Sequence, residues 1–475
     1  MRITKTKIIA TIGPSTNEYL SLKDLHAAGM NVARINMSHA SQTDALKIIE
    51  SIQKINRNQS QSFGPIGILL DTQGPEIRTG INQSDIDLQT GDIVNLSVRD
   101  DVDVETSSIK INYKGLIKSV DKGSKISIDN GLLNFKVLAK DNESLKCKVL
   151  DGGTLGSKRH VNLPGVRVDL PSITKKDRKD INFGIKHNVS FIALSFVRSA
   201  QDISNLRAIL KRNKSSIKII AKIENQEGLE NIHEITQAAD IVMVARGDLG
   251  IETDLADLPN IQRRIMYATA KWGRRSIVAT HLLESMIHHP TPTRAEVTDV
   301  ANAVYQGSDA VMLSEETAMG TYPIEAVSIM REIVVNAEQE NLTHYSSDVI
   351  NKINDNRNAI GNAIIAINES INIDAIVVMT ESGSTAAVVS QFRPNANLFA
   401  MTPHKKVCQR LTLVWGIVSL VTPKFLSTDD MLISAEKILK DNKYVCKDDV
   451  FILTSGVPVG VVGSTNMLKI QKVTD

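Results

Sequence analysis

Short apolar runs, each followed by polar or glycine-rich residues, recur along the chain at intervals that suit strands alternating with helices. The clearest example is 217–252, where apolar runs at both ends flank a segment whose apolar residues recur at helical spacing. We interpret this segment as a strand, a helix and a second strand. Eight runs of this kind are predicted as strands: 7–11, 31–36, 66–71, 190–195, 217–224, 241–245, 276–280 and 309–313.

Eight strands with helical patterns between most of them predict an α/β fold built on a closed (β/α)₈ TIM barrel. In that fold the functional site is built where the strands end, because the carboxyl ends of parallel strands share one rim. The residues predicted to collect there are Thr11, Pro14, Arg34, Asn36, Ser38, Asp71, Thr72, Ser195, Lys222, Glu224, Asp248, Thr280 and Ser314.

Three charged residues stand at the ends of two successive predicted strands. Lys222 and Glu224 are two positions apart, so their side chains leave the same face of a strand, and Asp248 follows the next strand. Mg²⁺ prefers few carboxylates plus oxygen from a phosphorylated substrate, and a lysine neutralises a phosphoryl group in transfer. Any one of these residues alone is better explained as a solvated charge, whereas the three together favour a metal and phosphate site.

The gap between the third and fourth predicted strands is too long for a barrel connection. Its residues alternate with period two, and Asn130-Gly131 suits a hairpin turn. We interpret it as an inserted all-β barrel domain that closes over the site and excludes water, with hinges at Pro75 and 163–165. The predicted domains are 1–75 with 171–340 (barrel), 76–170 (insertion) and 341–475 (C-terminal).

The C-terminal part again alternates strand and helix patterns, after a polar segment at 342–357 that we interpret as a boundary. This predicts a three-layer α/β domain with strands at 375–379, 398–401, 417–421 and 450–453. The first strand runs into a hydroxyl-rich loop before a predicted helix at 386–392, which is an anion-binding arrangement as well as an ordinary helix cap. The candidate anion-binding residues are Thr380, Ser382, Gly383, Ser384 and Thr385.

The composition of the chain argues against several classes of protein. With 475 residues the chain has room for two to four domains. Lysine and arginine number 55 against 53 acidic residues, and a net charge of +2 gives no reason to expect nucleic acid or membrane partners. The chain has 3 cysteines, too few for a disulfide framework or a zinc site, and no apolar stretch of membrane-spanning length. We therefore expect a cytoplasmic enzyme.

Several motifs resemble the pyruvate kinase family, and together they cover essentially the whole chain. They are TKIIATIGP at 6–14, NVARINMSH at 31–39, GPEIR at 74–78, VNLPG at 161–165, KIEN at 222–225, ARGDLG at 245–250, PTRAE at 292–296 and DVANA at 299–303. The family transfers the phosphoryl group of phosphoenolpyruvate to ADP, giving pyruvate and ATP. The resemblance also implies a homotetramer activated by a phosphorylated metabolite.

The resemblance implies roles for individual residues. Lys222 stabilises the phosphoryl group in transfer, and Glu224 and Asp248 ligate Mg²⁺ or Mn²⁺. The backbone at Arg246, Gly247 and Asp248 holds the substrate carboxylate, Arg34 and Arg78 neutralise phosphate oxygens, and Thr280 belongs to the relay that protonates the enolate. The implied K⁺ ligands are Asn36, Ser38, Asp71 and Thr72. The implied nucleotide contacts are Thr11, Pro14, Asn36, His39, Arg78 and Arg159.

Some positions depart from the family pattern or decide between its variants. Departures are Ala40, Gln73, His281 and Glu315, and Arg159 stands where lysine is more common. An acidic residue at the position of Glu76 goes with a requirement for K⁺. The acidic stretch 427–430 lies where members that take a sugar bisphosphate present basic or aromatic groups, so we expect an effector with a single phosphate.

Two other functions fit part of the pattern. One is a metal-dependent barrel aldolase or lyase that handles pyruvate enolates, which would lack the inserted domain and the nucleotide contacts. The other is an inactive sensor that binds a sugar phosphate through 380–385, against which the intact Lys222, Glu224 and Asp248 argue.

Overall fold

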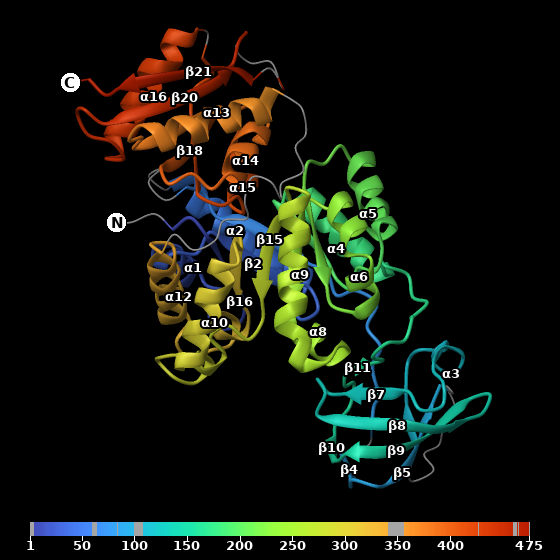
Figure 1. Cartoon of the computed structure of the whole chain (residues 1–475). Coiled ribbons are helices and arrows are strands. Elements are labelled where there is room, and N and C mark those ends of the chain that lie inside the picture. Colours follow the sequence, from blue (N-terminus) through green and yellow to red (C-terminus); the bar gives the residue numbers. More distant parts are fainter. Residues whose placement is uncertain are drawn as a thin grey trace.

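The computed structural model describes residues 4–58, 64–82, 84–98, 108–340, 356–425, 427–458, 463 and 465–474. Figure 1 shows a central barrel with a β-rich part at one end and an α/β part at the other. The predicted boundary segment 342–357 falls almost entirely outside the described residues, and the domain limits drawn from the sequence stay a prediction. No helix of the described residues is both long and apolar enough to cross a bilayer.

The predicted (β/α)₈ barrel is confirmed. Each barrel strand pairs in parallel with its two neighbours. The strand order around the closed barrel is β1-β16-β15-β14-β13-β12-β3-β2. Every predicted strand has its counterpart, with ends that shift by at most one residue. The strands are β1 (Lys7–Thr11), β2 (Val32–Asn36), β3 (Gly67–Asp71), β12 (Phe191–Leu194), β13 (Lys218–Ile223), β14 (Ile241–Ala245), β15 (Arg275–Ala279) and β16 (Ala310–Leu313).

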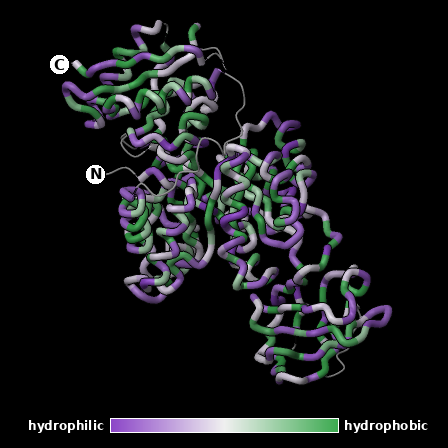
Figure 2. The backbone as a smooth tube through the Cα atoms, viewed as in Figure 1, coloured by the Kyte–Doolittle hydropathy of each residue, from purple (hydrophilic) through white to green (hydrophobic). Residues whose placement is uncertain are grey.

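Helices surround this barrel, and the barrel strands separate an inner core from an outer one. Alternate strand residues such as Ile9 and Met243 point into the barrel, while their neighbours Ile8 and Val242 pack against the helices. Figure 2 shows hydrophobic and hydrophilic residues alternating along these helices. The helices are α1 (Tyr19–Ala28), α2 (Gln42–Asn58), α4 (Lys175–Lys186), α5 (Ala200–Arg212), α6 (Gln226–Glu230), α7 (Ile232–Ala238), α8 (Arg246–Glu252), α9 (Leu258–Lys271), α10 (Arg294–Tyr305), α11 (Glu315–Ala318) and α12 (Pro323–Ala337).

The insertion is built from β-strands around its own apolar core, and all of its described strand pairs are antiparallel except β5 with β6. A six-stranded sheet runs β11-β7-β8-β9-β5-β6, and β10 pairs with β4. The predicted hairpin at Asn130-Gly131 joins β7 and β8, and both residues have positive φ, as the turn requires. The elements are β4 (Ile86–Leu88), β5 (Ile93–Ser97), β6 (Ser108–Lys110), α3 (Leu116–Ser119), β7 (Lys125–Ile128), β8 (Leu133–Lys140), β9 (Ser144–Asp151), β10 (Gly153–Leu155) and β11 (Val161–Asn162).

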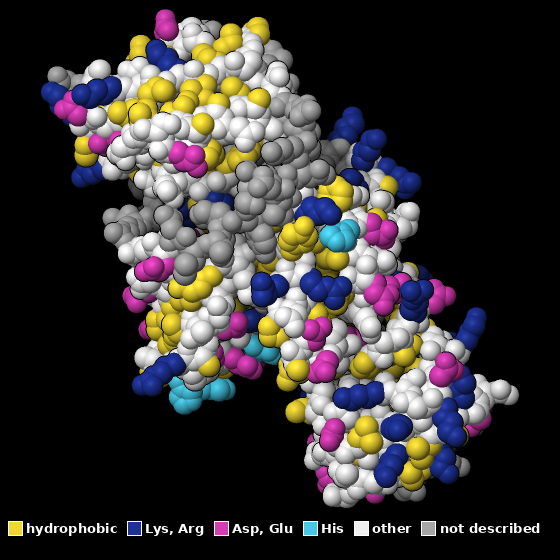
Figure 3. Space-filling view, in the orientation of Figure 1, with side chains coloured by type: hydrophobic (Ala, Val, Ile, Leu, Met, Phe, Trp, Pro, Cys, Tyr) yellow, Lys and Arg dark blue, Asp and Glu magenta, His cyan; other side chains and the backbone are white. Residues whose placement is uncertain are grey.

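The C-terminal part has the predicted three layers, with apolar clusters on both faces of one sheet. Its order is β19-β18-β17-β20-β21, and the last strand, which the sequence did not predict, pairs antiparallel with β20. The elements are α13 (Asn356–Ser370), β17 (Ala375–Met379), α14 (Ser384–Gln391), β18 (Asn397–Thr402), α15 (Lys405–Leu411), β19 (Ile417–Val421), α16 (Thr428–Asp441), β20 (Val450–Gly456) and β21 (Thr465–Lys472). Figure 3 shows acidic and basic side chains interspersed on the visible face.

Candidate active site

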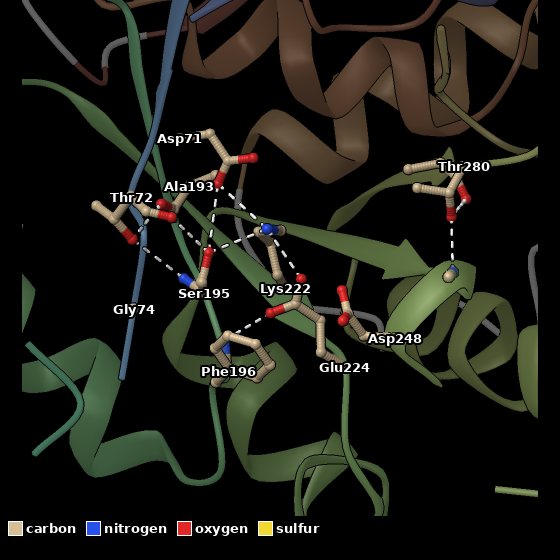
Figure 4. A network of polar contacts seen from close by, with 12 residues as sticks. Asp71, Thr72, Gly74, Ala193, Ser195, Phe196, Lys222, Glu224, Asp248 and Thr280 are labelled. Carbon is tan, nitrogen blue, oxygen red and sulfur yellow. Dashed lines mark hydrogen bonds and ion pairs between the residues drawn. The ribbon is translucent and has the colours of Figure 1, made fainter. Parts of the chain in front are cut away.

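Lys222 lies at the centre of a network of polar contacts where the barrel strands end (Figure 4). Its Nζ is 2.9 Å from Glu224 Oε1, 3.3 Å from Asp71 Oδ1 and 3.0 Å from Ser195 Oγ. These partners follow or end three neighbouring strands, β13, β3 and β12. The parallel barrel therefore brings together residues that are far apart in sequence, as the strand-end argument predicts.

The charges around Lys222 keep it protonated. Burial alone would lower the pKa of Lys222, but the nearby carboxylates of Asp71 and Glu224 outweigh burial and raise it. Burial likewise favours the neutral form of Asp71, yet the charges of Lys222 and Arg34 hold the pKa of Asp71 below its usual range. Arg34 donates to Asp71 Oδ2 from Nε at 2.9 Å, and its Nη2 is 2.7 Å away. A buried carboxylate thus fixes two cations beside each other.

Glu224 and Asp248 form the acidic side of the site. Burial raises the pKa of Glu224 despite the charge of Lys222, and the proximity of Asp248 adds to the rise. Burial also raises the pKa of Asp248. The Phe196 N–H fixes Glu224 by donating to its Oε2 at 2.6 Å. The buried carboxylate of Glu224 and the partly exposed one of Asp248, which resist ionising next to each other, fit a divalent cation whose charge would remove that cost.

The described residues contain no cluster of three or more His, Cys, Asp or Glu side chains placed to hold a metal ion. A cation between Glu224 and Asp248 would therefore take its remaining oxygens from water and substrate, which is the coordination that Mg²⁺ prefers. Asp248 also lies 3.9 Å from His160 Nδ1, a residue of the insertion.

Helix α8 begins at the rim, directly after β14. The Gly247 N–H donates to Thr280 Oγ1 at 2.8 Å, which places Thr280 at the start of the helix (Figure 4). Arg246 Nη2 donates to the Thr280 carbonyl at 2.7 Å, and its Nη1 is 2.7 Å from Asp299 Oδ2. Thr280 and the following His281 both have left-handed backbone conformations, with φ of 69° and 54°. The first turn of α8 and the loop after β15 thus hold each other in place.

The residues predicted to bind K⁺ come together at the ends of β2 and β3. Asn36 and Asp71 are register partners on these strands, and Asn36 Oδ1 accepts from the Ser38 N–H at 3.1 Å. Thr72 Oγ1 donates to the Ala193 carbonyl at 3.1 Å and accepts from the Ser195 N–H at 3.2 Å. This ties the Asp71–Thr72 segment to the same serine that contacts Lys222.

The predicted nucleotide contacts lie on two parts of the chain. Thr11 Oγ1 accepts from Arg34 Nη1 at 2.9 Å, which joins it to the network. Arg78 Nε is 2.7 Å from Glu76 Oε2, and Arg159 Nη1 is 3.4 Å from Asp129 Oδ1, so both cations are paired near the insertion. Pro14 and His39 lie at the rim, after β1 and β2, and no side-chain partner within the described ranges fixes a role for them.

Gln73, a departure from the family pattern, donates to Glu76 Oε2 at 3.0 Å. Burial alone would raise the pKa of Glu76, but hydrogen bonds from Arg78 and Gln73 lower it. Glu76 is therefore a firmly ionised carboxylate at the junction with the insertion. Sequence reasoning placed Ser195 at the rim and Asp299 in a family motif but gave neither a role, and it did not single out His160. Their contacts join distant segments that no local pattern links.

The hydroxyl-rich loop in the C-terminal part begins α14, two residues earlier than predicted. Gly383 has φ of 85°, and its N–H donates to Thr380 Oγ1 at 2.9 Å. Ser382 Oγ and Ser384 Oγ lie 3.0 Å apart, whereas the buried Thr385 hydroxyl is 2.6 Å from Thr465 Oγ1. The loop borders a cavity whose other walls include Thr422, Lys424 and Ser455.

Comparison with known proteins places the whole chain in one family. A family model described as "Pyruvate kinase, barrel domain" matches residues 3–327, and another described as "Pyruvate kinase, alpha/beta domain" matches 358–471. A pyruvate kinase of Staphylococcus epidermidis is 44% identical over 99% of this chain and 81% of its own length. One from Staphylococcus aureus is 43% identical over the same shares. The chain therefore belongs to the pyruvate kinase family.

A crystal structure of a pyruvate kinase from Cryptosporidium parvum matches with a TM-score of 0.93 at 36% identity, covering 99% of this chain and 96% of that one. The enzyme is a phosphotransferase of glycolysis that makes pyruvate and ATP from phosphoenolpyruvate and ADP. Family membership implies a general dependence on a divalent metal and on potassium. The aldolase and inactive-sensor alternatives are thereby set aside.

Proposed function

We propose that Lys222 is the residue that stabilises the phosphoryl group while it moves from phosphoenolpyruvate to ADP. The observation that carries this role is the position of its Nζ, held by Asp71, Glu224 and Ser195 at the centre of the rim. Phosphoryl transfer spreads negative charge over the transferred oxygens, and a fixed cation in a buried site stabilises that charge without rearranging first.

Glu224 and Asp248 hold Mg²⁺ or Mn²⁺ in this account. The bound cation supplies a positive charge that polarises the substrate oxygens. The protein's own part is to fix the two carboxylates: the Phe196 N–H orients Glu224, and α8 carries Asp248. The backbone of Arg246, Gly247 and Asp248 holds the substrate carboxylate. Support for this comes from the Arg246 contacts to Asp299 and Thr280, which fix the first turn of α8.

Arg34 and Arg78 neutralise phosphate oxygens, and Thr280 takes part in the relay that protonates the enolate. Arg34 is held by Asp71 on one side and Thr11 on the other, so its guanidinium is oriented before substrate arrives. Thr280 Oγ1 already lies at the start of α8, beside the proposed carboxylate position.

Asn36, Ser38, Asp71 and Thr72 supply oxygen ligands to K⁺. Their proximity at the ends of β2 and β3 supports this role. The nucleotide lies along the rim and is covered by the insertion, which acts as a lid. The proposed nucleotide contacts are Thr11, Pro14, Asn36, His39, Arg78 and Arg159.

The loop Thr380, Ser382, Gly383, Ser384 and Thr385 binds an activating metabolite with one phosphate. Two further hydroxyls support a polar ligand there. Thr422 and Ser455 line the same cavity, are 5% and 2% exposed, and their oxygens lack a hydrogen-bond partner among the described residues. Lys424 adds a cation. We further propose that the enzyme is a cytoplasmic homotetramer, in which the effector favours the active arrangement.

Mn²⁺ binding tests the proposed metal ligands without relying on turnover. Paramagnetic resonance measures free Mn²⁺ in the presence of phosphoenolpyruvate for the parent, Glu224→Gln and Asp248→Asn. Loss of a ligand is expected to weaken binding by about tenfold or more. The matched control is Glu234→Gln, an exposed carboxylate on α7. Unchanged Mn²⁺ affinity in both rim variants contradicts the assignment.

A further inference from the structure

A cavity of about 130 Å³ lies in the angle between the insertion and the barrel. Both chain connections between these two parts line it, with Pro75 and Ile77 on one connection and residues from 163–170 on the other. The barrel contributes Phe196 and Glu252. Figure 1 shows α8, which ends at Glu252, next to β11 of the insertion. A molecule in this cavity therefore touches both connections and the barrel at once.

Apolar residues and polar residues share the lining of the cavity. Val161, Leu163 and Val168 are among the apolar lining residues. Among the polar ones, Asn162 is 3% exposed, and its Nδ2 donates to Glu252 Oε1 at 3.0 Å. Within the described part of the chain, nothing donates to Asn162 Oδ1. A buried amide oxygen without a donor is costly, so this atom marks a position where a ligand can donate.

Among the residues that the structure describes, no cation pairs with Glu252. Burial raises the pKa of Glu252 to about 7, because desolvation outweighs the hydrogen bond from Asn162. The two arginines that line the cavity are already paired: Arg167 Nη2 is 3.6 Å from Glu230 Oε2, and Arg198 donates to backbone carbonyls of the connection. Glu227 adds a further carboxylate to the lining. Asn162 thus presents a hydrogen-bond acceptor, and Glu252 presents a carboxylate. A cationic hydrogen-bond donor complements both.

We propose that this cavity binds a small primary amine with a compact apolar body, whose ammonium group lies between Asn162 Oδ1 and the Glu252 carboxylate. An ammonium has three donors and one charge, so it satisfies both atoms. The volume suits a body of one ring, since an apolar cavity of ~150 Å³ accommodates benzene. The apolar lining residues provide the hydrophobic contact that such a body needs.

Short chains of residue contacts connect this cavity to the active site. Phe196 lines the cavity, and its N–H donates to Glu224 Oε2. Glu252 follows Asp248 by one turn on α8. His160, which also lines the cavity, has its ring 5.9 Å from that of Phe196 and its Nδ1 3.9 Å from Asp248. A bound amine therefore acts on the supports of both proposed metal ligands and on the lid connections.

Benzylamine is the probe for this site, and its binding to the full-length enzyme is measured by calorimetry. Benzyl alcohol, which has the same ring without the charge, is expected to bind at least about tenfold more weakly. Glu252→Gln is expected to weaken benzylamine binding at least about tenfold, because the charge partner is lost. Glu230→Gln is the matched control, a carboxylate on the same cavity that already pairs with Arg167, and we expect a change below about twofold.

A second variant tests whether benzylamine occupies the cavity itself while the charge of Glu252 is kept. Val166→Trp fills the space between the connection and the barrel but keeps Asn162 and Glu252, and it is expected to abolish benzylamine binding while circular dichroism stays unchanged. Equal binding of benzyl alcohol and benzylamine, or full affinity in Glu252→Gln or in folded Val166→Trp, overturns the proposal.

Coupling is tested by the apparent affinity for phosphoenolpyruvate. Saturating benzylamine is expected to change this affinity by at least about threefold in the parent and to have no effect in Glu252→Gln. Binding without any change in phosphoenolpyruvate affinity overturns the regulatory part. The residue roles proposed above are independent of this site, because Mn²⁺ binding by Glu224 and Asp248 is measured without the amine.

Discussion

Ser195 Oγ lies 3.0 Å from Lys222 Nζ and 2.7 Å from the carbonyl oxygen of Thr72. The ammonium can only donate, so the serine hydroxyl accepts from Lys222 and directs its own proton to Thr72. One buried hydroxyl therefore joins the proposed phosphoryl-stabilising lysine to the segment proposed to bind K⁺. Ser195 is 1% exposed, which prevents water from replacing this contact freely.

We predict that Ser195→Ala lowers kcat by about tenfold, because a hydrogen bond to a charged group stabilises by ~1.5 kcal/mol or more. We expect Ser195→Ala to fold normally and Lys222 to stay charged. The ammonium group of Lys222 is then held less firmly, because one hydrogen bond is lost. Steady-state assays measure kcat and the K⁺ activation constant together, and both are expected to change. Ser314→Ala is the matched control, since the buried hydroxyl of this serine at a strand end has no hydrogen-bond partner among the described residues. A similar loss in both variants contradicts a specific role for Ser195.

Lys7 gives a pH dependence of stability. It is 3% exposed at the start of β1, and its Nζ donates to the Ile417 carbonyl of the C-terminal part at 2.8 Å. Burial lowers the pKa of Lys7 from 10.5 to about 8. Between these two values the unfolded chain binds a proton that the folded chain does not, so stability rises with pH across that window. The full effect is ~3 kcal/mol.

The measurement is the apparent Tm of the parent and of Lys7→Met between pH 7 and pH 10.5. We expect the Tm of the parent to rise relative to that of Lys7→Met as the pH passes 8. A constant difference in Tm across this range shows that Lys7 stays protonated in the folded enzyme.

The barrel and the polar residues at its rim could be located from sequence because both depend on local patterns. Buried strands of a parallel barrel are apolar runs, and the polar residue after each run marks the rim. The final strand, β21, was missed because only some residues of its polar segment are buried, at the edge of a sheet. The loop 380–385 was located correctly, but the buried pair of Thr385 with Thr465 depends on that missed strand.

Contacts between distant segments were beyond sequence reasoning for a physical reason. Arg246 with Asp299, and Asn162 with Glu252, are pairs fixed by how elements pack, and neither residue of a pair carries a local signal for the other. The charges of Lys222, Glu224 and Asp248 were predicted as a group, since strand order alone brings them to one rim. Their protonation required burial and distances that only the structure gives.

Glu76 leads us to predict dependence on K⁺. It is ionised and held by Arg78 and Gln73 at the junction with the lid. Replacing K⁺ by tetramethylammonium at matched ionic strength is expected to lower kcat by about tenfold or more, because the cation's charge is lost from the rim. Glu76→Lys is expected to reduce this dependence, because the lysine supplies a positive charge. Glu76→Gln supplies no charge and is expected to leave the dependence on K⁺ in place. Equal rates in both salts contradict the prediction.

The effector site is tested by titrating ribose 5-phosphate, glucose 6-phosphate, AMP and fructose 1,6-bisphosphate while the apparent affinity for phosphoenolpyruvate is followed. A monophosphate is expected to activate, and Ser382→Glu to prevent activation by placing a negative charge on the exposed side of the loop. Ser370→Glu, an exposed serine at the end of α13, is the matched control. Activation by the bisphosphate alone, or of Ser382→Glu to the full extent, contradicts a pocket for one phosphate.

The role of Lys222 is tested most directly by kcat for pyruvate and ATP formation in Lys222→Met. The change removes the charge and keeps the apolar stem, and one fixed charge at the transition state is commonly worth a factor of about a hundred or more in kcat. Lys218→Met, which loses a partly exposed lysine of β13 that pairs with Asp240, is the control. We predict a loss of at least about a hundredfold in Lys222→Met and less than about twofold in Lys218→Met. A near-normal kcat in folded Lys222→Met would contradict the account.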